Sequence, residues 1–137
     1  MIVLDTNVLS ELIRPRPDAT VLAWLDAQPE EQLCTTAVSV QESFFGAELL
    51  ADSPRRSELL ARLEQVYDRL AVLPYDETCA RYTAVILARA RAHGRAMHQA
   101  DAQIAGIALR HDAALATRNT SDFAHTGVAL IDPWVGT

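Results

Sequence analysis

Short apolar segments alternate with longer helical patterns along this chain. Most of the short segments lack polar alternation, which is typical of strands in a parallel sheet that is covered on both faces. The predicted strands are Ile2 to Leu4, Leu33 to Thr36, Leu70 to Leu73, Ala114 to Thr117 and Val128 to Ile131.

The segments between these strands show the spacing of amphipathic helices. The predicted helices are Asn7 to Ile13, Thr20 to Ala27, Val38 to Leu50, Pro54 to Arg69, Glu77 to Ala92 and Gln99 to His111. Pro15, Pro17 and Pro29 follow the first two helices as stops, and Gly94 ends the fifth. With no internal repeat or linker, the pattern predicts one α/β domain over residues 1–137, a three-layer α/β/α sandwich with a central, mainly parallel sheet.

Composition indicates an ordinary folded protein. The 137 residues are 50% hydrophobic and 22% charged, which excludes a disordered chain. The N-terminus has no basic leader, and no apolar run approaches the roughly 20 residues of a membrane span, so a cytoplasmic location is expected. Cys34 and Cys79 fit no metal or redox spacing and are interpreted as reduced, partly buried residues.

The net negative charge of the chain argues against a nucleic-acid partner, unless the electrostatic potential is positive at the binding site. The net charge is −6, and such a molecule repels a phosphate backbone. Divalent cations bound at a carboxylate site would reverse that field. All 12 basic residues are Arg, which excludes lysine-dependent sites such as a P-loop.

Three acidic residues occupy positions where burial is expected. Removing an isolated carboxylate from water costs on the order of several kcal/mol. Asp5 ends the first apolar run, at the sheet edge where open α/β proteins form ligand crevices. Glu42 and Asp101 are expected to project from largely apolar helical faces toward the sheet. Their neighbours on those faces are Val38, Phe45 and Leu49 for Glu42, and Ile104, Ala105 and Ala108 for Asp101. Carboxylates gathered from distant segments repel unless a cation lies between them, so a divalent metal site is the first hypothesis.

Simpler interpretations remain for single residues. Asp5 would serve as a helix N-cap, and Asp101 would be favoured in a first turn by the helix dipole. Glu42 lies mid-helix and caps nothing. After the fourth strand, Asp122 or Asn119 would emerge at the same edge of a parallel sheet, and Asp122 would also suit a turn or a short-helix cap.

Four motifs in order resemble PIN-domain ribonucleases, specifically VapC-type toxins. They are Ile2-Val3-Leu4-Asp5-Thr6-Asn7, Val40-Gln41-Glu42-Ser43-Phe44-Phe45-Gly46, Ala100-Asp101-Ala102-Gln103-Ile104-Ala105, and Thr117-Arg118-Asn119 through Asp122-Phe123. The resemblance covers nearly the whole chain, including the ending Asp132-Pro133-Trp134. It implies a single PIN domain whose acidic cluster binds Mg²⁺ or Mn²⁺ for endonucleolytic cleavage of RNA.

The resemblance also implies roles for individual residues. Asp5 and Asp101 would be the principal metal ligands, Glu42 would complete the set directly or through water, and Asp122 would be the fourth acid. Thr6, Asn7 and Thr117 would orient Asp5 or a bound water. Asn119 departs from relatives with aspartate near this place. His98 replaces the usual small polar residue before the third acid and is expected to be an exposed loop histidine.

The chemistry follows from these donors. Hard oxygen ligands without cysteine favour Mg²⁺ or Mn²⁺ over Zn²⁺. Such an ion would activate water against a phosphodiester, and the resemblance implies products with a 5′-phosphate and a 3′-hydroxyl. Arg118 and Arg95 lie near the motifs and would contact backbone phosphates, although a solvated arginine is the simpler interpretation.

The resemblance implies two protein partners: a small antitoxin whose tail fills a groove near the active site, and a second copy of the chain in a homodimer. The helices at Thr20 to Ala27 and Val38 to Leu50 would supply the groove through Trp24, Leu25, Phe44 and Phe45, which are otherwise interpreted as core. Two other classes stay open. One is an inactive PIN-like binding module, and the other is a different metal-dependent phosphoesterase, such as a DNA flap nuclease or a small-molecule phosphatase.

Overall fold

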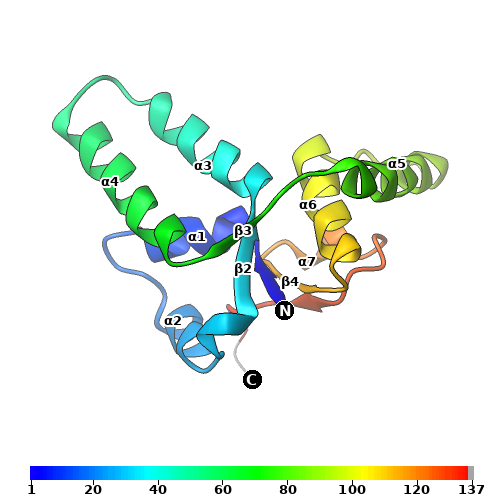
Figure 1. Ribbon diagram of the computed structural model, residues 1–137, viewed down its shortest axis with the longest axis horizontal. Coiled ribbons are helices and arrows are strands. Elements are labelled where there is room, and N and C mark those ends of the chain that lie inside the picture. Colours follow the sequence, from blue (N-terminus) through cyan, green and yellow to red (C-terminus); the bar gives the residue numbers. More distant parts are fainter. Residues whose placement is uncertain (136–137) are drawn as a thin grey trace.

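The computed structural model describes residues 1–135, and its centre is a parallel five-stranded sheet (Figure 1). The strands are β1 (Ile2–Leu4), β2 (Leu33–Thr36), β3 (Ala71–Leu73), β4 (Ala114–Ala116) and β5 (Leu130–Ile131). Their order across the sheet is β3-β2-β1-β4-β5, and all four pairings are parallel. This arrangement confirms the predicted sheet.

The helices also occupy the predicted segments. They are α1 (Thr6–Leu12), α2 (Ala19–Asp26), α3 (Ala37–Glu48), α4 (Pro54–Asp68), α5 (Glu77–Ala92) and α6 (Gln99–Arg110). Two further elements were not predicted, the 3₁₀ helix η1 (Glu30–Gln32) and the four-residue helix α7 (Thr120–Phe123). Both are too short to show helical periodicity in a sequence.

Capping side chains explain why several boundaries differ from the predictions. Asp5, Asp18 and Thr36 accept hydrogen bonds from the first-turn N–H groups of α1, α2 and α3, so these helices begin one residue earlier than predicted. The last strand is shorter than predicted. β5 spans two residues instead of four, because its pairing with β4 is limited to Leu115–Leu130 and Ala116–Ile131. Gly94 follows the end of α5 with φ +69°, which confirms it as the helix stop.

Helices cover both faces of the sheet. Figure 1 shows α1, α2, α3 and α4 on one side and α5, α6 and α7 on the other. Each side has its own core, one around Leu4, Val8 and Leu9, and the other around Val3, Ile104 and Leu115. The molecule is therefore a three-layer α/β/α sandwich, as predicted.

The strand order creates a crevice above β1 and β4. From β1 the chain proceeds outward to β2 and β3, and then returns to place β4 on the opposite side of β1. Loops leaving β1 and β4 consequently diverge onto opposite faces, which opens a binding crevice at their carboxyl ends. Asp5 and Thr117 come directly after these two strands.

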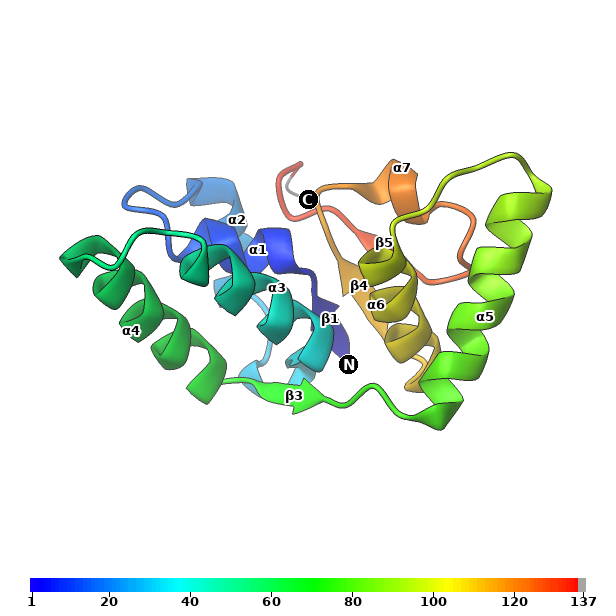
Figure 2. The same cartoon turned by 90° about the horizontal axis from the view of Figure 1, so that it is seen from above.

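The helices α5 and α6 pack closely along their length (Figure 2). The contact depends on Gly106, whose missing side chain makes room for the Thr83 hydroxyl and the Cys79 carbonyl. Thr83 Oγ1 in turn donates to the Cys79 carbonyl at 2.8 Å. This packing sets the position of α6, and with it the position of Asp101.

Among the helices of residues 1–135, none combines the length and the apolar character that crossing a membrane would require. Cys34 and Cys79 are both buried and both free.

Candidate functional site

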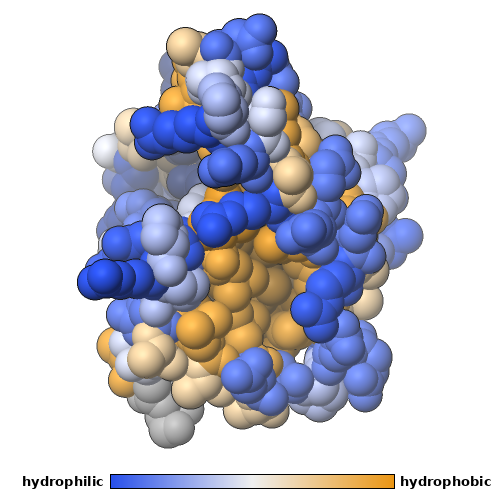
Figure 3. All heavy atoms as spheres, turned by 90° about the vertical axis from the view of Figure 1, so that its left-hand side faces the viewer, coloured by the Kyte–Doolittle hydropathy of each residue, from blue (hydrophilic) through white to orange (hydrophobic). Residues whose placement is uncertain are grey.

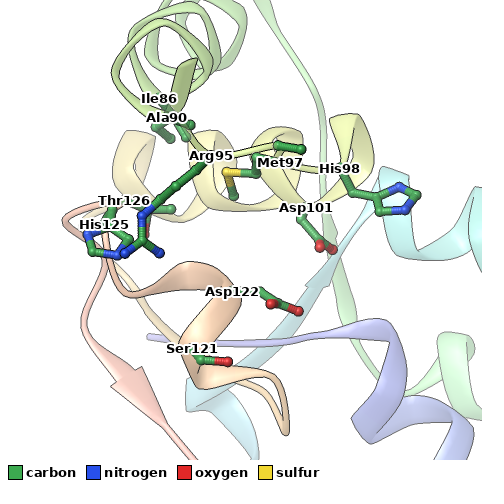
Figure 4. Close-up of a pocket in the computed structure, with 11 residues that line it drawn as sticks. Ile86, Ala90, Arg95, Met97, His98, Asp101, Ser121, Asp122, His125 and Thr126 are labelled. Carbon is green, nitrogen blue, oxygen red and sulfur yellow. The ribbon is translucent and has the colours of Figure 1, made fainter. Parts of the chain in front are cut away.

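Four carboxylates from four parts of the chain gather at the carboxyl end of the sheet. Asp5 stands between β1 and α1, Glu42 in the middle of α3, Asp101 in the first turn of α6, and Asp122 in α7. The charges of Asp5, Glu42 and Asp122 each raise the pKa of Asp101, so Asp101 lies within electrostatic reach of all three. Figure 4 shows the carboxylates of Asp101 and Asp122 directed toward the same space.

Asp5 is held by a set of hydrogen bonds. Its side chain is 4% exposed, and it accepts from the Thr6 N–H at 2.8 Å and from Thr117 Oγ1 at 2.7 Å. Burial raises its pKa, the two hydrogen bonds oppose that rise, and the charge of Glu42 adds to it. Asp5 is thus the helix cap that the simpler interpretation proposed, and it also faces the other acids.

Asn7 ties the two strand ends together. Its amide nitrogen donates to Asp5 Oδ2 at 3.3 Å and to Thr117 Oγ1 at 3.2 Å, while its oxygen accepts from the Arg118 N–H at 3.3 Å. Thr117 Oγ1 also accepts from the Asn119 N–H at 3.1 Å. Asn119 therefore supports the site through its backbone, whereas Asp122 is the residue after β4 whose charge acts on Asp101.

Glu42 is oriented by Thr6 on the facing helix. Thr6 Oγ1 lies 2.7 Å from Glu42 Oε1 and 3.0 Å from Ser39 Oγ. The prediction that Glu42 projects from an apolar, sheet-facing surface was wrong, since Phe45 and Leu49 are 63% and 70% exposed and only Val38 is buried. Glu42 points toward the site because it lies at the boundary between the buried and exposed faces of α3, where Thr6 can reach it.

Replacing Thr6 by valine is expected to reduce the activity of the site about tenfold, because it removes the hydroxyl that orients the Glu42 carboxylate and a hydrogen bond to a charged group is worth about 1.5–3 kcal/mol. The Thr6→Ser variant keeps the hydroxyl and should retain near wild-type activity. Activity assays of both variants would measure both effects. Equal activity of Thr6→Val and wild type would show that Thr6 does not orient Glu42.

Among the four acids of the site, Asp101 has a strongly raised pKa. Its pKa is raised to about 6, first by burial and then by the charges of Asp5, Glu42 and Asp122. Its neighbours on α6, Ile104, Ala105 and Ala108, are fully buried, which confirms the predicted apolar face. A carboxyl in such surroundings resists ionisation until a cation compensates it.

Glu11 is a buried acid whose negative charge is compensated by nearby groups. Glu11 is 4% exposed and accepts from Arg14 Nη1 at 3.1 Å and from the Asp18 N–H at 3.2 Å. The five ion pairs within residues 1–135 use Glu11, Glu30, Glu48, Asp76 and Glu77, and none involves Asp5, Glu42, Asp101 or Asp122. The sequence did not single out Glu11, since its polar partners lie in the loop after α1.

The raised pKa predicts a specific dependence of stability on pH in metal-free protein. Between pH 4 and about pH 6 the folded state retains a proton on Asp101 that the unfolded state, with the ordinary value of 3.8, has released. Stability of the wild type therefore falls as pH rises through this window. Asp101→Asn removes the effect, so its stability relative to wild type should increase from pH 4 to pH 7 by about 1 kcal/mol, after discounting for partial solvent screening.

Urea unfolding in EDTA at several pH values would measure this difference. The same substitution at exposed Asp52, on the loop before α4, is the matched control. A stability difference that stays constant over the window would contradict the raised pKa of Asp101.

The donors suit a hard divalent cation. All four acids offer carboxylate oxygens, and Asp101 lacks a compensating positive charge apart from a weak effect of His98. Within the described part of the chain, no three Asp, Glu, His or Cys side chains are close enough to enclose one ion. Mg²⁺ in proteins is usually held by one or two carboxylates and keeps several waters. Asp5 and Asp101 would hold the ion, with Glu42 and Asp122 acting directly or through water.

Two arginines, Arg118 and Arg95, come from segments next to the site. The Arg118 guanidinium lies over the Trp134 ring, 5.2 Å from its centroid, and is held there by a cation–π contact. Arg95 lines a pocket that Asp101 and Asp122 also line. His98 is exposed and forms the N-cap position of α6, as expected.

Three residues that the sequence did not single out support this site. The Ser39 hydroxyl lies 3.0 Å from the Thr6 hydroxyl, which leaves the Thr6 proton free for Glu42, and Tyr67 donates to the Ser39 carbonyl at 2.8 Å. Ser39 lies three residues before Glu42, on the same helical face, which was a usable signal. Tyr67 and Trp134 come from elsewhere in the chain, and their positions depend on how α4 and the C-terminal segment pack.

Comparison with known proteins shows extensive similarity. The model of the PIN domain family matches residues 2–129. The chain is 44% identical over 137 residues to VapC ribonuclease Y4jK of Sinorhizobium fredii, with 98% of each chain covered. It is 40% identical to toxin FitB of Neisseria gonorrhoeae, covering 98% of this chain and 99% of that one. The crystal structure of FitAcB from Neisseria gonorrhoeae superposes with a TM-score of 0.90 at 39% identity, covering 98% of this chain and 99% of that chain.

Proposed function

Because this chain belongs to the PIN domain family, in its VapC-type toxin branch, we propose that it is a Mg²⁺- or Mn²⁺-dependent endoribonuclease and the toxin of a toxin–antitoxin pair. The observation that carries the proposal is the gathering of Asp5, Glu42, Asp101 and Asp122 without a compensating arginine in residues 1–135. A close relative, Y4jK, is named a ribonuclease. The cytoplasm is the proposed location, since RNA is available there.

The residues of the site have separable tasks. Asp5 and Asp101 would hold the cation from the two sides of the crevice, and the hydrogen bonds to Thr6 and Thr117 keep the Asp5 carboxylate in place. When bound, the cation supplies a Lewis acid that activates water and stabilises negative charge on the phosphate. Glu42, oriented by Thr6, and Asp122 complete the acidic lining. Arg118 and Arg95 would bind the flanking phosphates and so offset the net charge of −6.

Cleavage assays on purified protein test the proposal. We expect structured RNA to be cut with Mg²⁺ or Mn²⁺, to be left intact in EDTA, and to yield 5′-phosphate ends. Mapping cleavage ends across total RNA after a brief pulse of expression would identify the target. RNA binding without cutting would favour the inactive binding module, and preferential cutting of flapped DNA or of small phosphate esters would favour the other phosphoesterases.

An antitoxin is the proposed protein partner. A groove of about 440 Å³ lies between α1, α2, β2 and α4, and Figure 3 shows this apolar, hollowed face. Its apolar lining consists of Leu4, Leu12, Leu25, Leu33, Val66 and Leu70. Apolar grooves of this kind accept an amphipathic helix.

The residues predicted to supply an antitoxin groove occupy different places in the structure. Leu25 lines the groove, but its facing wall comes from α4 instead of α3. Trp24 and Phe44 pack against the core, as the alternative interpretation held. Phe45 belongs to neither, since its side chain is 63% exposed. The sequence could not separate these cases because α3 has apolar residues on more than one face.

A homodimer is the proposed assembly. Phe45 on α3, Leu49 at the C-cap of α3, and Tyr82 and Val85 on α5 are large apolar side chains that are 42% to 70% exposed. A second copy would remove this surface from water. Sedimentation of wild type and of Phe45→Asp would show whether the chain dimerises through α3.

A further inference from the structure

A second recess adjoins the four carboxylates. It has a volume of about 290 Å³ and is walled by α5, the α5–α6 loop, α6, α7 and the loop after α7. Asp101 and Asp122 form one end of this pocket (Figure 4). Whatever occupies the pocket therefore lies directly beside the proposed metal-binding acids.

The inner part of the pocket is apolar. Ile86 and Ala90 of α5 line it and are 5% and 7% exposed. The Met97 side chain lies between them and the acids in Figure 4. A polarisable thioether over an aliphatic surface suits the face of a flat ring.

The end opposite the acids is cationic. The side chain of Arg95 runs toward His125 in Figure 4, and both residues line the pocket. No ion pair in residues 1–135 involves Arg95. An arginine fork beside an imidazole is suited to bind a phosphate.

Hydrogen bonds of the local backbone fix the positions of both residues in the chain. Arg95 follows Gly94, which has φ +69°, and the Arg95 N–H donates to the Ala90 carbonyl at 2.8 Å. His125 precedes Thr126, whose buried hydroxyl donates to the Phe123 carbonyl at 2.7 Å. Each of the two residues is therefore next to a hydrogen-bonded turn, although the side chains of Arg95 and His125 are exposed.

We propose that this pocket is a nucleotide subsite for the RNA residue that flanks the cleaved bond. The base packs on Met97 and the apolar inner wall, its phosphate binds Arg95 and His125, and the adjoining phosphodiester extends to Asp101 and Asp122. The inference rests on the proposed ribonuclease function and names the part of the substrate that this side of the site binds. An enclosed base would also contribute to the choice of cleavage sequence.

The two methionines of the chain, Met1 and Met97, allow a test that does not depend on cleavage. Protein labelled at the methionine methyl groups gives two NMR signals, and Met1 serves as the internal control. Titration is done in EDTA with 5′-mononucleotides, the matching nucleosides and inorganic phosphate, so that no cation can hold phosphate at the acids. We expect a saturable, upfield ring-current shift of Met97 with at least one mononucleotide, and about tenfold weaker binding of that nucleoside and of phosphate.

Variants assign the phosphate contact. Arg95→Ala and His125→Ala should each weaken mononucleotide binding about tenfold, whereas Arg55→Ala on α4 carries the same charge change and should have no effect. In cleavage assays, Arg95→Ala should raise KM about tenfold and leave kcat near the wild-type value.

Failure of the inference is distinct from failure of the proposed function. No saturable shift of Met97, an equal shift with phosphate alone, or unchanged binding in both pocket variants would overturn the subsite even if wild type cuts RNA. A wild type that binds nucleotides at Met97 but cuts no RNA would keep the subsite as a binding site and reject the nuclease.

Discussion

Asp5→Asn and Asp101→Asn are each expected to reduce RNA cleavage by at least about a thousandfold. Each change removes one negative oxygen from the pair proposed to hold the cation. Loss of the cation forfeits several kcal/mol of charge stabilisation on the phosphate, and about 1.4 kcal/mol corresponds to a tenfold change in rate. The two carboxylates come from different elements, Asp5 from the N-cap of α1 and Asp101 from the first turn of α6, so neither should substitute for the other.

Single-turnover cleavage of a mapped RNA, with titration of Mn²⁺, measures both the rate and the metal affinity. Asp52→Asn is the control for the same change of charge. Asp101→Asn should be at least as stable as wild type in EDTA at neutral pH, which would exclude unfolding as the cause of lost activity. Equal cleavage by wild type and both variants would contradict the proposal that Asp5 and Asp101 hold the cation.

Gly106→Ala is expected to destabilise the protein by about 3 kcal/mol, which corresponds to roughly 10 °C in Tm for a chain of this size. An added Cβ would overlap the Thr83 hydroxyl and come within 2.8 Å of the Cys79 carbonyl. The carbonyl belongs to the backbone of α5 and cannot rotate away, so α5 and α6 would have to separate. Because α6 carries Asp101, cleavage should weaken as well.

Gly46→Ala offers the matched control for this prediction. Gly46 lies within α3, and nothing is within 4 Å of a Cβ built there. The same substitution should therefore stabilise the protein by about 0.5–1 kcal/mol through helix propensity alone. Thermal and urea unfolding would compare the two variants, and effects of the same sign would show that close packing of α5 on α6 does not constrain Gly106.

Local patterns predicted most of the fold. The apolar runs such as Ile2–Leu4 and the helical spacing of Gln99–Arg110 depend only on neighbouring residues. The structure contains the corresponding strands and helices, with boundaries that differ from the predicted ones by at most one or two positions. The errors arose where a side chain or a short pairing set the boundary, as Asp5 does for α1 and the Leu115–Leu130 pair does for β5.

The candidate site was predictable to a lesser degree. Asp5 and Asp101 could be placed from the sequence because a strand end and an apolar helical face define where their carboxylates lie. Glu42 was selected for a wrong reason, since Phe45 and Leu49 are exposed and its orientation comes from Thr6, 36 positions away in sequence. The stacking of Arg118 on Trp134 was not predicted, because it joins segments whose separation in space the sequence does not specify.

The sequence by itself determined the order of strands and helices, the parallel sheet and the acids that end up at its carboxyl edge. These follow from periodicity, helix caps and the desolvation cost of a carboxylate, all of which act over a few residues. Only the tertiary structure decided that burial and the charges of three neighbouring carboxylates raise the pKa of Asp101, that Glu11 is instead paired with Arg14, and that a pocket with Arg95 and His125 lies beside the acids. Those features depend on how whole elements pack, and packing is set by contacts between residues far apart in the chain.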